Sequence, residues 1–277
     1  MIKIVTDSTC DLPENIIQQY DITVVPCYIN FPEKSYLDGV DISRQEFYEK
    51  LPAYNPPPTT SAPAIGTFAK IYKDLLEGGA SHILSIHIST VLSGIYNVAV
   101  LAAESMENKR IITFDPGQLS LGTGFVVEAA AKAAQEGKTI EEILAIARDV
   151  ARRTFTFAAA NTLTYLQRSG RVSSIKAKLG SLLQIKPILA MNQGKITSYT
   201  SRTFNGALHQ LVDILKSLEP LEKLAIVHSN ALDRVALLFS ESRQYFPNPQ
   251  DYYTVDITPV LGSHLGPGVF GFVAVTN

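Results

Sequence analysis

Residues 82–94, HILSIHISTVLSG, join a β-rich run to a cluster of hydroxyl groups and a glycine. Residues 82–88 are rich in Ile and predict a buried β-strand. The residues that follow predict a helix over 93–106, and residues 110–114 predict the next strand. This order is typical of a parallel sheet, and it places Ser93 and Gly94 where a strand gives way to a helix. Free backbone N–H groups at such a point suit an anionic group.

The same alternation extends over the first half of the chain. Strands are predicted at residues 2–6, 22–29, 82–88 and 110–114. Helices are predicted at residues 13–20, 63–77, 93–106 and 119–135. A further helix begins at Thr139, with Glu142 completing a capping box. The order of these elements predicts a parallel sheet covered by helices on both faces.

The pattern changes near residue 155. Strands are predicted at residues 155–161, 186–191, 196–200, 223–228, 252–257 and 269–275. A tight turn over 192–195 makes a hairpin, which favours a mixed or antiparallel sheet, and helices at 205–218 and 233–245 are expected on one face of it. We therefore predict an α/β protein of two domains, an N-terminal parallel α/β domain over residues 1–155 and a C-terminal mixed or antiparallel α/β domain over 156–277.

Composition and charge restrict the classes of partner and the cellular location that the sequence favours. The formal charge of −2 has no long run of one sign, so it favours neither nucleic acid nor an anionic membrane surface. The cysteines, Cys10 and Cys27, lie in apolar segments and are interpreted as buried free thiols. No signal peptide is recognisable, and charges interrupt every window long enough to span a bilayer. A cytoplasmic protein without an integral membrane segment is expected.

Clusters of hydroxyl-bearing and glycine residues suggest a small anionic ligand. They lie at residues 59–63, 89–94, 119–124 and 262–268. Pro63 is favoured in the first turn of a helix, which makes Ser61 or Ala62 the expected cap and places Thr60 and Ser61 beside free N–H donors. Ordinary helix capping is the alternative explanation. Loops at the carboxyl ends of parallel strands form binding crevices, so the clusters at 59–63 and 89–94 are expected on one rim.

Two further segments carry candidate binding residues. Arg168 and Arg171 flank a glycine at a predicted helix end, where they form either a solvated turn or a pair for a carboxylate or phosphate. His264 lies among glycines in a predicted loop before the last strand. It is either structural or a hydrogen-bonding group for a ligand that the glycines let approach.

The sequence carries few signs of catalysis. It contains no GxxxxGK[ST] phosphate loop, no GxSxG elbow and no HxH or HExxH spacing for a metal. A non-catalytic carrier of a small anionic ligand is therefore the main hypothesis. The alternative is an enzyme, a phosphotransferase or serine hydrolase using Ser93 and His264 with Asp7 or Asp115 at predicted strand ends.

Six segments, in chain order, resemble motifs of the DegV family. Residues 4–13 (IVTDSTCDLP) resemble its first strand and Thr-Asp-Ser start. Residues 60–64 (TSAPA), 93–96 (SGIY) and 163–172 (LTYLQRSGRV) are similar to its Thr-Ser-Gln-Pro-Ser, Ser-Gly-Thr-Tyr and Leu-x-Tyr-Leu-x-x-Gly-Gly-Arg-Ile motifs. Residues 185–189 (IKPIL) and 262–268 (GSHLGPG) complete the set. The likeness runs from residue 2 to about 272.

The resemblance implies a two-domain protein that binds one long-chain fatty acid, such as palmitate, stearate or oleate, between its domains. Some family members are the lipid-binding subunit of bacterial fatty acid kinase and present the carboxylate to a separate ATP-using kinase, for phospholipid synthesis. A lipid sensor without a kinase partner is the alternative.

The resemblance also assigns roles to particular residues. By position, the carboxylate would be held by the following residues: Thr60, Ser61, Ser93, Gly94 and His264. Arg171 occupies the position linked in the family to partner function, and no cofactor or metal is implied.

Overall fold

The computed structural model describes residues 1–171, 185–248 and 252–277. It contains three β-sheets, of four, six and three strands. In these described ranges no helix combines the length and the apolar character that a bilayer crossing requires.

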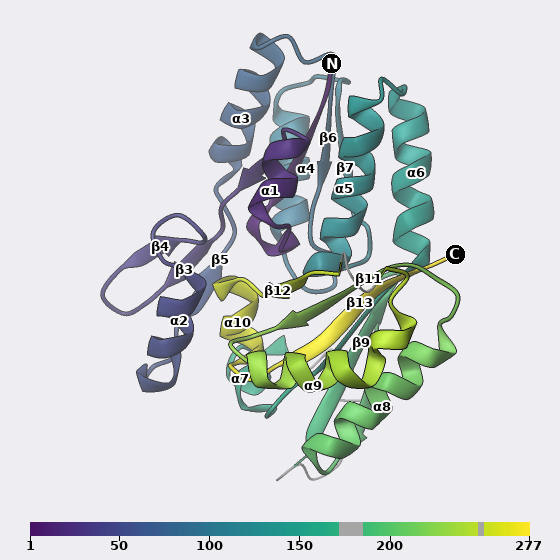
Figure 1. The fold of residues 1–277 in the computed structure, drawn as a ribbon. Helices are drawn as coiled ribbons and strands as arrows, with labels where there is room; N and C mark the ends of the chain where they lie inside the picture. The colour runs from purple at the N-terminus through teal and green to yellow at the C-terminus, as the bar shows by residue number, and fades with distance from the viewer. Residues whose placement is uncertain (172–184, 249–251) are drawn as a thin grey trace.

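The first sheet is parallel and is formed by the first part of the chain. Its strand order is β2-β1-β6-β7, with every pair parallel. The strands are β1 (Ile2–Asp7), β2 (Thr23–Val25), β6 (His82–Ile86) and β7 (Ile111–Phe114). The helices of this part are α1 (Glu14–Gln19), α3 (Ile65–Glu77), α4 (Ile95–Ser105), α5 (Leu121–Gln135) and α6 (Ile140–Arg153). Figure 1 shows α3 and α4 on one side of the sheet and α5 and α6 on the other.

The second sheet is mixed and follows in the chain. Its order is β10-β9-β8-β13-β11-β12, antiparallel except between β11 and β12. The strands are β8 (Thr154–Ala159), β9 (Lys186–Asn192), β10 (Lys195–Ser201), β11 (Leu221–His228), β12 (Thr254–Asp256) and β13 (Phe270–Thr276). Helices α8 (Phe204–Ser217) and α9 (Leu232–Ser242) pack on one face and share a core with it. The fold class, a parallel sheet followed by a mixed one, is confirmed, while the boundary at residue 155 stays a prediction.

A third, antiparallel sheet was not predicted. It joins β3 (Tyr28–Asn30) to β4 (Ser35–Leu37) and β5 (Thr59–Ser61), beside α2 (Arg44–Lys50). The single strand expected over 22–29 is therefore wrong, because β2 and β3 belong to different sheets. Pro26, which lacks a backbone N–H, lies at the break between them. The described residues also form two short helices, α7 (Thr164–Arg168) and α10 (Pro259–Leu265). Three short 3₁₀ turns are η1 (Ser8–Cys10), η2 (Leu51–Ala53) and η5 (Arg243–Tyr245).

The second sheet packs directly on the first part of the chain. Val227, Val255 and Val273 of the second sheet belong to the same buried cluster as Val5 and Phe125. Helix α5 touches both β1 of the first sheet and β8 of the second. One continuous apolar core therefore fixes the two sheets relative to each other, and it fixes what lies between their edges.

Close backbone packing in the second sheet gives a test of this arrangement. A Cβ added at Gly271 of β13 would lie 2.0 Å from the carbonyl oxygen of Phe157 in the neighbouring strand. Gly271→Ala is expected to lower the free energy of unfolding by about 3 kcal/mol, measured by urea denaturation. The same change at Gly66, where a Cβ meets nothing within 4 Å, is the control, expected to be neutral or stabilising. Equal effects at the two positions would contradict the packing.

Candidate functional site

A cavity of about 210 Å³ lies between the carboxyl end of the parallel sheet and the second sheet. Thr9, which follows β1, and Ile88, which follows β6, line it from one side. Strand β8 contributes Thr156, and β9 contributes Leu189 from the other side. All the carboxylate-binding residues expected from the sequence line this cavity, together with Arg171: they are Thr60, Ser61, Ser93, Gly94 and His264.

Thr60 meets His264 at one end of the cavity. Its Oγ1 lies 3.0 Å from the imidazole Nε2. Thr60 is held in β5 by its pairing with Ile29, and His264 lies in the last turn of α10, a seven-residue helix. The loop expected around His264 is therefore wrong, because Pro259 starts a helix that continues to Leu265.

The helix cap expected at Ser61 or Ala62 is also wrong. Helix α3 begins at Ile65, and Ala64 occupies its N-cap position. Thr59–Ser61 is strand β5, and the Ser61 hydroxyl accepts a hydrogen bond from the Asn30 side chain at 3.1 Å. Thr60 and Ser61 line the cavity from β5, an edge strand of the small sheet, rather than from the N-terminus of a helix.

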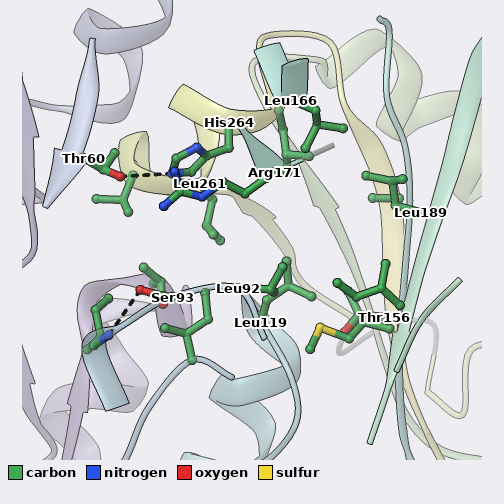
Figure 2. Close-up of a pocket in the computed structure, with 18 of the residues that line it drawn as sticks. Thr60, Leu92, Ser93, Leu119, Thr156, Leu166, Arg171, Leu189, Leu261 and His264 are labelled. Carbon is green, nitrogen blue, oxygen red and sulfur yellow. Dashed lines mark hydrogen bonds between the residues drawn. The ribbon is translucent and has the colours of Figure 1, made fainter. Parts of the chain in front are cut away.

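Ser93 and Gly94 occupy the place that the sequence predicts. Gly94 is the N-cap of α4, and Ser93 Oγ accepts from the backbone N–H of Ile95 at 3.3 Å. Gly94 is exposed, and a Cβ there would meet nothing within 4 Å. The start of α4 therefore presents a hydroxyl and backbone N–H groups to the cavity from the side opposite Thr60, as Figure 2 shows for Ser93.

His264 is neutral in this environment. Burial and, to a smaller extent, the positive charge of Arg171 together lower the pKa of its imidazole to about 4. Its Nδ1 is buried and has no hydrogen-bond partner among the described residues. A buried N–H without a partner costs more free energy than a buried acceptor without one, so Nδ1 is the unprotonated nitrogen. The ring proton therefore lies on Nε2, which donates to the Thr60 hydroxyl. The hydroxyl proton of Thr60 is then free to be donated to a ligand.

Arg171 gives this end of the cavity a positive charge. It follows α7, and its guanidinium donates to the carbonyl oxygen of Ser169 at 2.8 Å. Arg171 is half-buried, and Figure 2 draws it beside His264. The motif that contains it extends in sequence to Val172, which lies outside the described residues.

Most of the remaining cavity wall is aliphatic, although Thr9 and Thr156 also line it. Figure 2 shows the polar end, with Thr60, Ser93 and His264, away from Leu189 and Thr156. The Thr156 hydroxyl is already donated to Gln118 Oε1 at 3.0 Å. The aliphatic lining consists of Ile88, Leu92, Ile95, Leu119, Leu166, Leu189, Met191, Ile196, Val260, Leu261 and Leu265. The sequence did not identify these residues, because an aliphatic side chain that lines a cavity has no pattern that separates it from the core.

The carboxylates of the enzyme hypothesis lie elsewhere. Asp7 Oδ2 is 2.9 Å from Nδ1 of His87, and Asp7 also accepts from Thr9. Burial acts to raise the pKa of Asp7, but His87 and these hydrogen bonds outweigh it and lower the pKa. Asp115 accepts from the Thr90 hydroxyl at 2.8 Å. Neither carboxylate lines the cavity, so the described residues do not form the expected arrangement of an acid with His264 and Ser93.

Comparison with known proteins places this chain in a family. A model described as "Uncharacterised protein, DegV family" matches residues 1–277. The chain belongs to the DegV family. This confirms the likeness seen in the six sequence motifs, and it applies to the whole length of the chain.

Individual relatives agree with this membership. A DegV domain-containing protein of Streptomyces coelicolor is 34% identical over 277 residues, with 98% of this chain and 97% of the relative covered. A fatty-acid-binding DegV family protein from Thermus thermophilus superposes with a TM-score of 0.90 at 32% identity, covering 100% of this chain and 99% of that one. DegV of Bacillus subtilis, a fatty acid binding protein, gives a TM-score of 0.86 at 29% identity, covering 99% of each chain.

The electrostatics of this DegV site can be tested by titration. In lipid-free protein, NMR should show His264 remaining neutral down to a pH near 4, because burial disfavours its charged form. The unfolded chain protonates near 6.5, so this group's contribution to stability is lost as pH falls from about 6.5 towards 4.

Two variants assign the His264 resonance and test the cause of its lowered pKa. His264→Asn identifies the resonance by removing it. Arg171→Gln should raise the pKa of His264, because a neighbouring positive charge is removed. A lipid-free pKa above 6 in the parent protein would contradict a buried, neutral imidazole.

Proposed function

We propose that this protein binds a single long-chain fatty acid in the cavity between its two larger sheets and presents the carboxylate to a separate fatty acid kinase. The carboxylate lies at the polar end, between Thr60 and Ser61 on one side and Ser93 and the Gly94 backbone on the other. His264 acts through Thr60, and the acyl chain extends into the aliphatic part. The protein supplies binding and orientation, while the kinase supplies ATP and the phosphoryl-transfer chemistry in the cytoplasm.

The observation that carries this proposal is the division of one cavity into a polar end and an aliphatic remainder. A carboxylate taken out of water needs several hydrogen-bond donors or a neighbouring positive charge. Hydroxyl groups and the backbone N–H groups at the start of α4 supply such donors. Each buried methylene contributes about 0.8 kcal/mol, so a chain of ordinary length outweighs the cost of association.

The DegV relatives support the class of ligand. The Thermus thermophilus and Bacillus subtilis proteins share more than a quarter of their residues with this chain over almost the whole fold, and both are fatty-acid-binding proteins. Palmitate, stearate and oleate are therefore the fatty acids to test first.

Transfer to a kinase requires an accessible carboxylate. Ser61 and Gly94, at the polar end of the cavity, are exposed, whereas the aliphatic side chains Ile88 and Leu261 are buried. A fatty acid bound in this direction has its reactive end near the surface and its chain inside. This arrangement supports presentation to a second protein.

Native mass spectrometry of the purified protein tests fatty-acid binding. One fatty acid per chain is expected, and binding of added oleate to delipidated protein should weaken about tenfold to a hundredfold in Ser93→Ala or Thr60→Val. Each change removes a hydrogen bond to a charged group, worth about 1.5–3 kcal/mol. Ser81→Ala, at the opposite end of β6, is the matched control and should bind like the parent. A protein that is purified without lipid and binds none would refute the proposal.

A variant at Arg171 distinguishes fatty-acid binding from transfer of the phosphoryl group by the kinase. Arg171→Ala is expected to retain oleate binding within a few-fold while acyl-phosphate formation with a bacterial fatty acid kinase falls at least about tenfold. Arg171 lines the cavity and is only half-buried, so it remains accessible to a second protein. Oleate affinity and coupled phosphorylation measured on the same preparation decide between the roles. An equal loss of oleate affinity and of phosphorylation would show that Arg171 binds the ligand carboxylate and has no separate role toward the kinase.

A further inference from the structure

A second cavity, of about 740 Å³, lies on the other side of the first strand's carboxyl end. Ser8 and Cys10 of the turn η1 line it, whereas Thr9 between them lines the first cavity. Helix α1, the connection between β4 and α2, and strand β12 supply other parts of the wall. The fatty-acid proposal leaves it without a role.

Acidic groups dominate the lining of this second cavity. Asp11, Asp38, Asp256 and Glu14 line it, and Arg44 is the one cation among the described residues of the lining. That cation is already engaged, because Arg44 donates to the carbonyl oxygen of Asp256 and its Nη2 lies 3.6 Å from Asp11 Oδ1. The lining of this cavity therefore presents an excess of negative charge.

Two buried polar atoms of the lining have no partner. Asp38 is 2% exposed, and its Oδ1 accepts no hydrogen bond from the described residues, although Oδ2 accepts from Ser8 at 2.7 Å. Thr258 is 4% exposed, and its Oγ1 also lacks a partner among those residues. A buried polar atom without a partner costs free energy, and an unpaired carboxylate oxygen costs more than a hydroxyl. A ligand that donates hydrogen bonds would remove both penalties.

The carboxylate of Asp11, which also lines this cavity, accepts hydrogen bonds at both of its oxygens. Asp11 Oδ1 accepts from the backbone N–H of Thr258 at 2.8 Å, and Oδ2 accepts from Ser120 at 2.5 Å. Burial raises the pKa of Asp11 to about 6 and that of Asp38 to about 7. Asp38, with only the Ser8 hydrogen bond, is thus the carboxylate that gains most from an added positive charge.

We propose that this second cavity binds a small organic cation whose ammonium or guanidinium group donates hydrogen bonds to Asp38 and Thr258. Its carbon chain packs against the apolar part of the wall, which includes Leu12, Ile17 and Val255. The acidic residues lie on several walls, and the described residues contain no group of three His, Cys, Asp or Glu placed to hold a metal ion. An extended organic cation fits that distribution better than a single metal ion does.

Three five-carbon probes of equal length and different charge test the proposal. Cadaverine carries two ammonium groups, 1,5-pentanediol is neutral and glutarate carries two carboxylates. Isothermal titration and amide NMR are run on full-length protein, both delipidated and loaded with oleate. Cadaverine is expected to bind saturably, at least about tenfold more tightly than the diol, with shifts at the Gly39 and Thr258 amides. Glutarate should not bind.

Variants locate the binding. Asp38→Asn should weaken cadaverine at least about tenfold, whereas Asp74→Asn, an exposed carboxylate on α3 paired with Lys70, should have no effect. Asp38→Asn is also expected to keep or raise the melting temperature at pH 8, because it removes a charge that burial disfavours. Should that variant fail to fold, Glu14→Gln at the exposed start of α1 replaces it, with an expected loss of about two- to threefold.

Three results would overturn the proposal. The first is no saturable cadaverine binding up to millimolar concentration. The second is binding that Asp38→Asn or its replacement leaves unchanged, or that the diol matches. The third is competition by oleate, which would assign cadaverine to the first cavity. Because the probes are tested with and without oleate, failure here leaves the fatty-acid proposal untouched.

Discussion

The position of helix α10 is the constraint on which the candidate site depends. This short helix carries His264, and three contacts from the first part of the chain hold the segment that leads into it. Asp11 accepts from the Thr258 N–H, Tyr48 OH donates to the Ile257 carbonyl at 3.0 Å, and Arg44 donates to the Asp256 carbonyl. The approach is close, because a Cβ at Gly262 would lie 2.4 Å from the Tyr48 hydroxyl. Without this anchoring, the imidazole would not reach Thr60.

The electrostatics follow from that placement. A buried imidazole near a guanidinium loses its proton, so the positive charge at the polar end of the cavity resides on Arg171 rather than on His264. The neutral ring keeps its hydrogen-bonding capacity and orients the Thr60 hydroxyl. A negatively charged ligand then meets Arg171, hydroxyl donors and the N–H groups at the start of α4. These groups can accept an anion without a metal ion.

Sequence patterns predicted the parts of this structure that depend on local periodicity. The apolar run at residues 82–88 and the helix after Gly94 are regular, and both occur as expected. The small sheet was missed because its strands are three residues each, too short for alternation to be seen. Because the small sheet was not predicted, Thr60 was expected beside the N-terminus of a helix, whereas it lies in strand β5. The glycines around His264 indicated a loop, although α10 contains one of them and ends at another. The aliphatic lining lay beyond prediction, because which buried residues face a cavity depends on how distant segments pack.

The two cavities share a wall but have opposite charge. Thr9 faces the cavity with Arg171, while its neighbours Ser8 and Cys10 face the cavity with Asp11 and Asp38. The start of α10 divides in the same way, with Thr258 lining the acidic cavity and Val260 and Leu261 lining the first cavity. Charges that face a low-dielectric interior interact more strongly than charges in water, so this separation has consequences for selectivity. A carboxylate is repelled from the acidic cavity, and an organic cation is repelled from Arg171. A single turn of chain thereby separates a site suited to anions from one suited to cations.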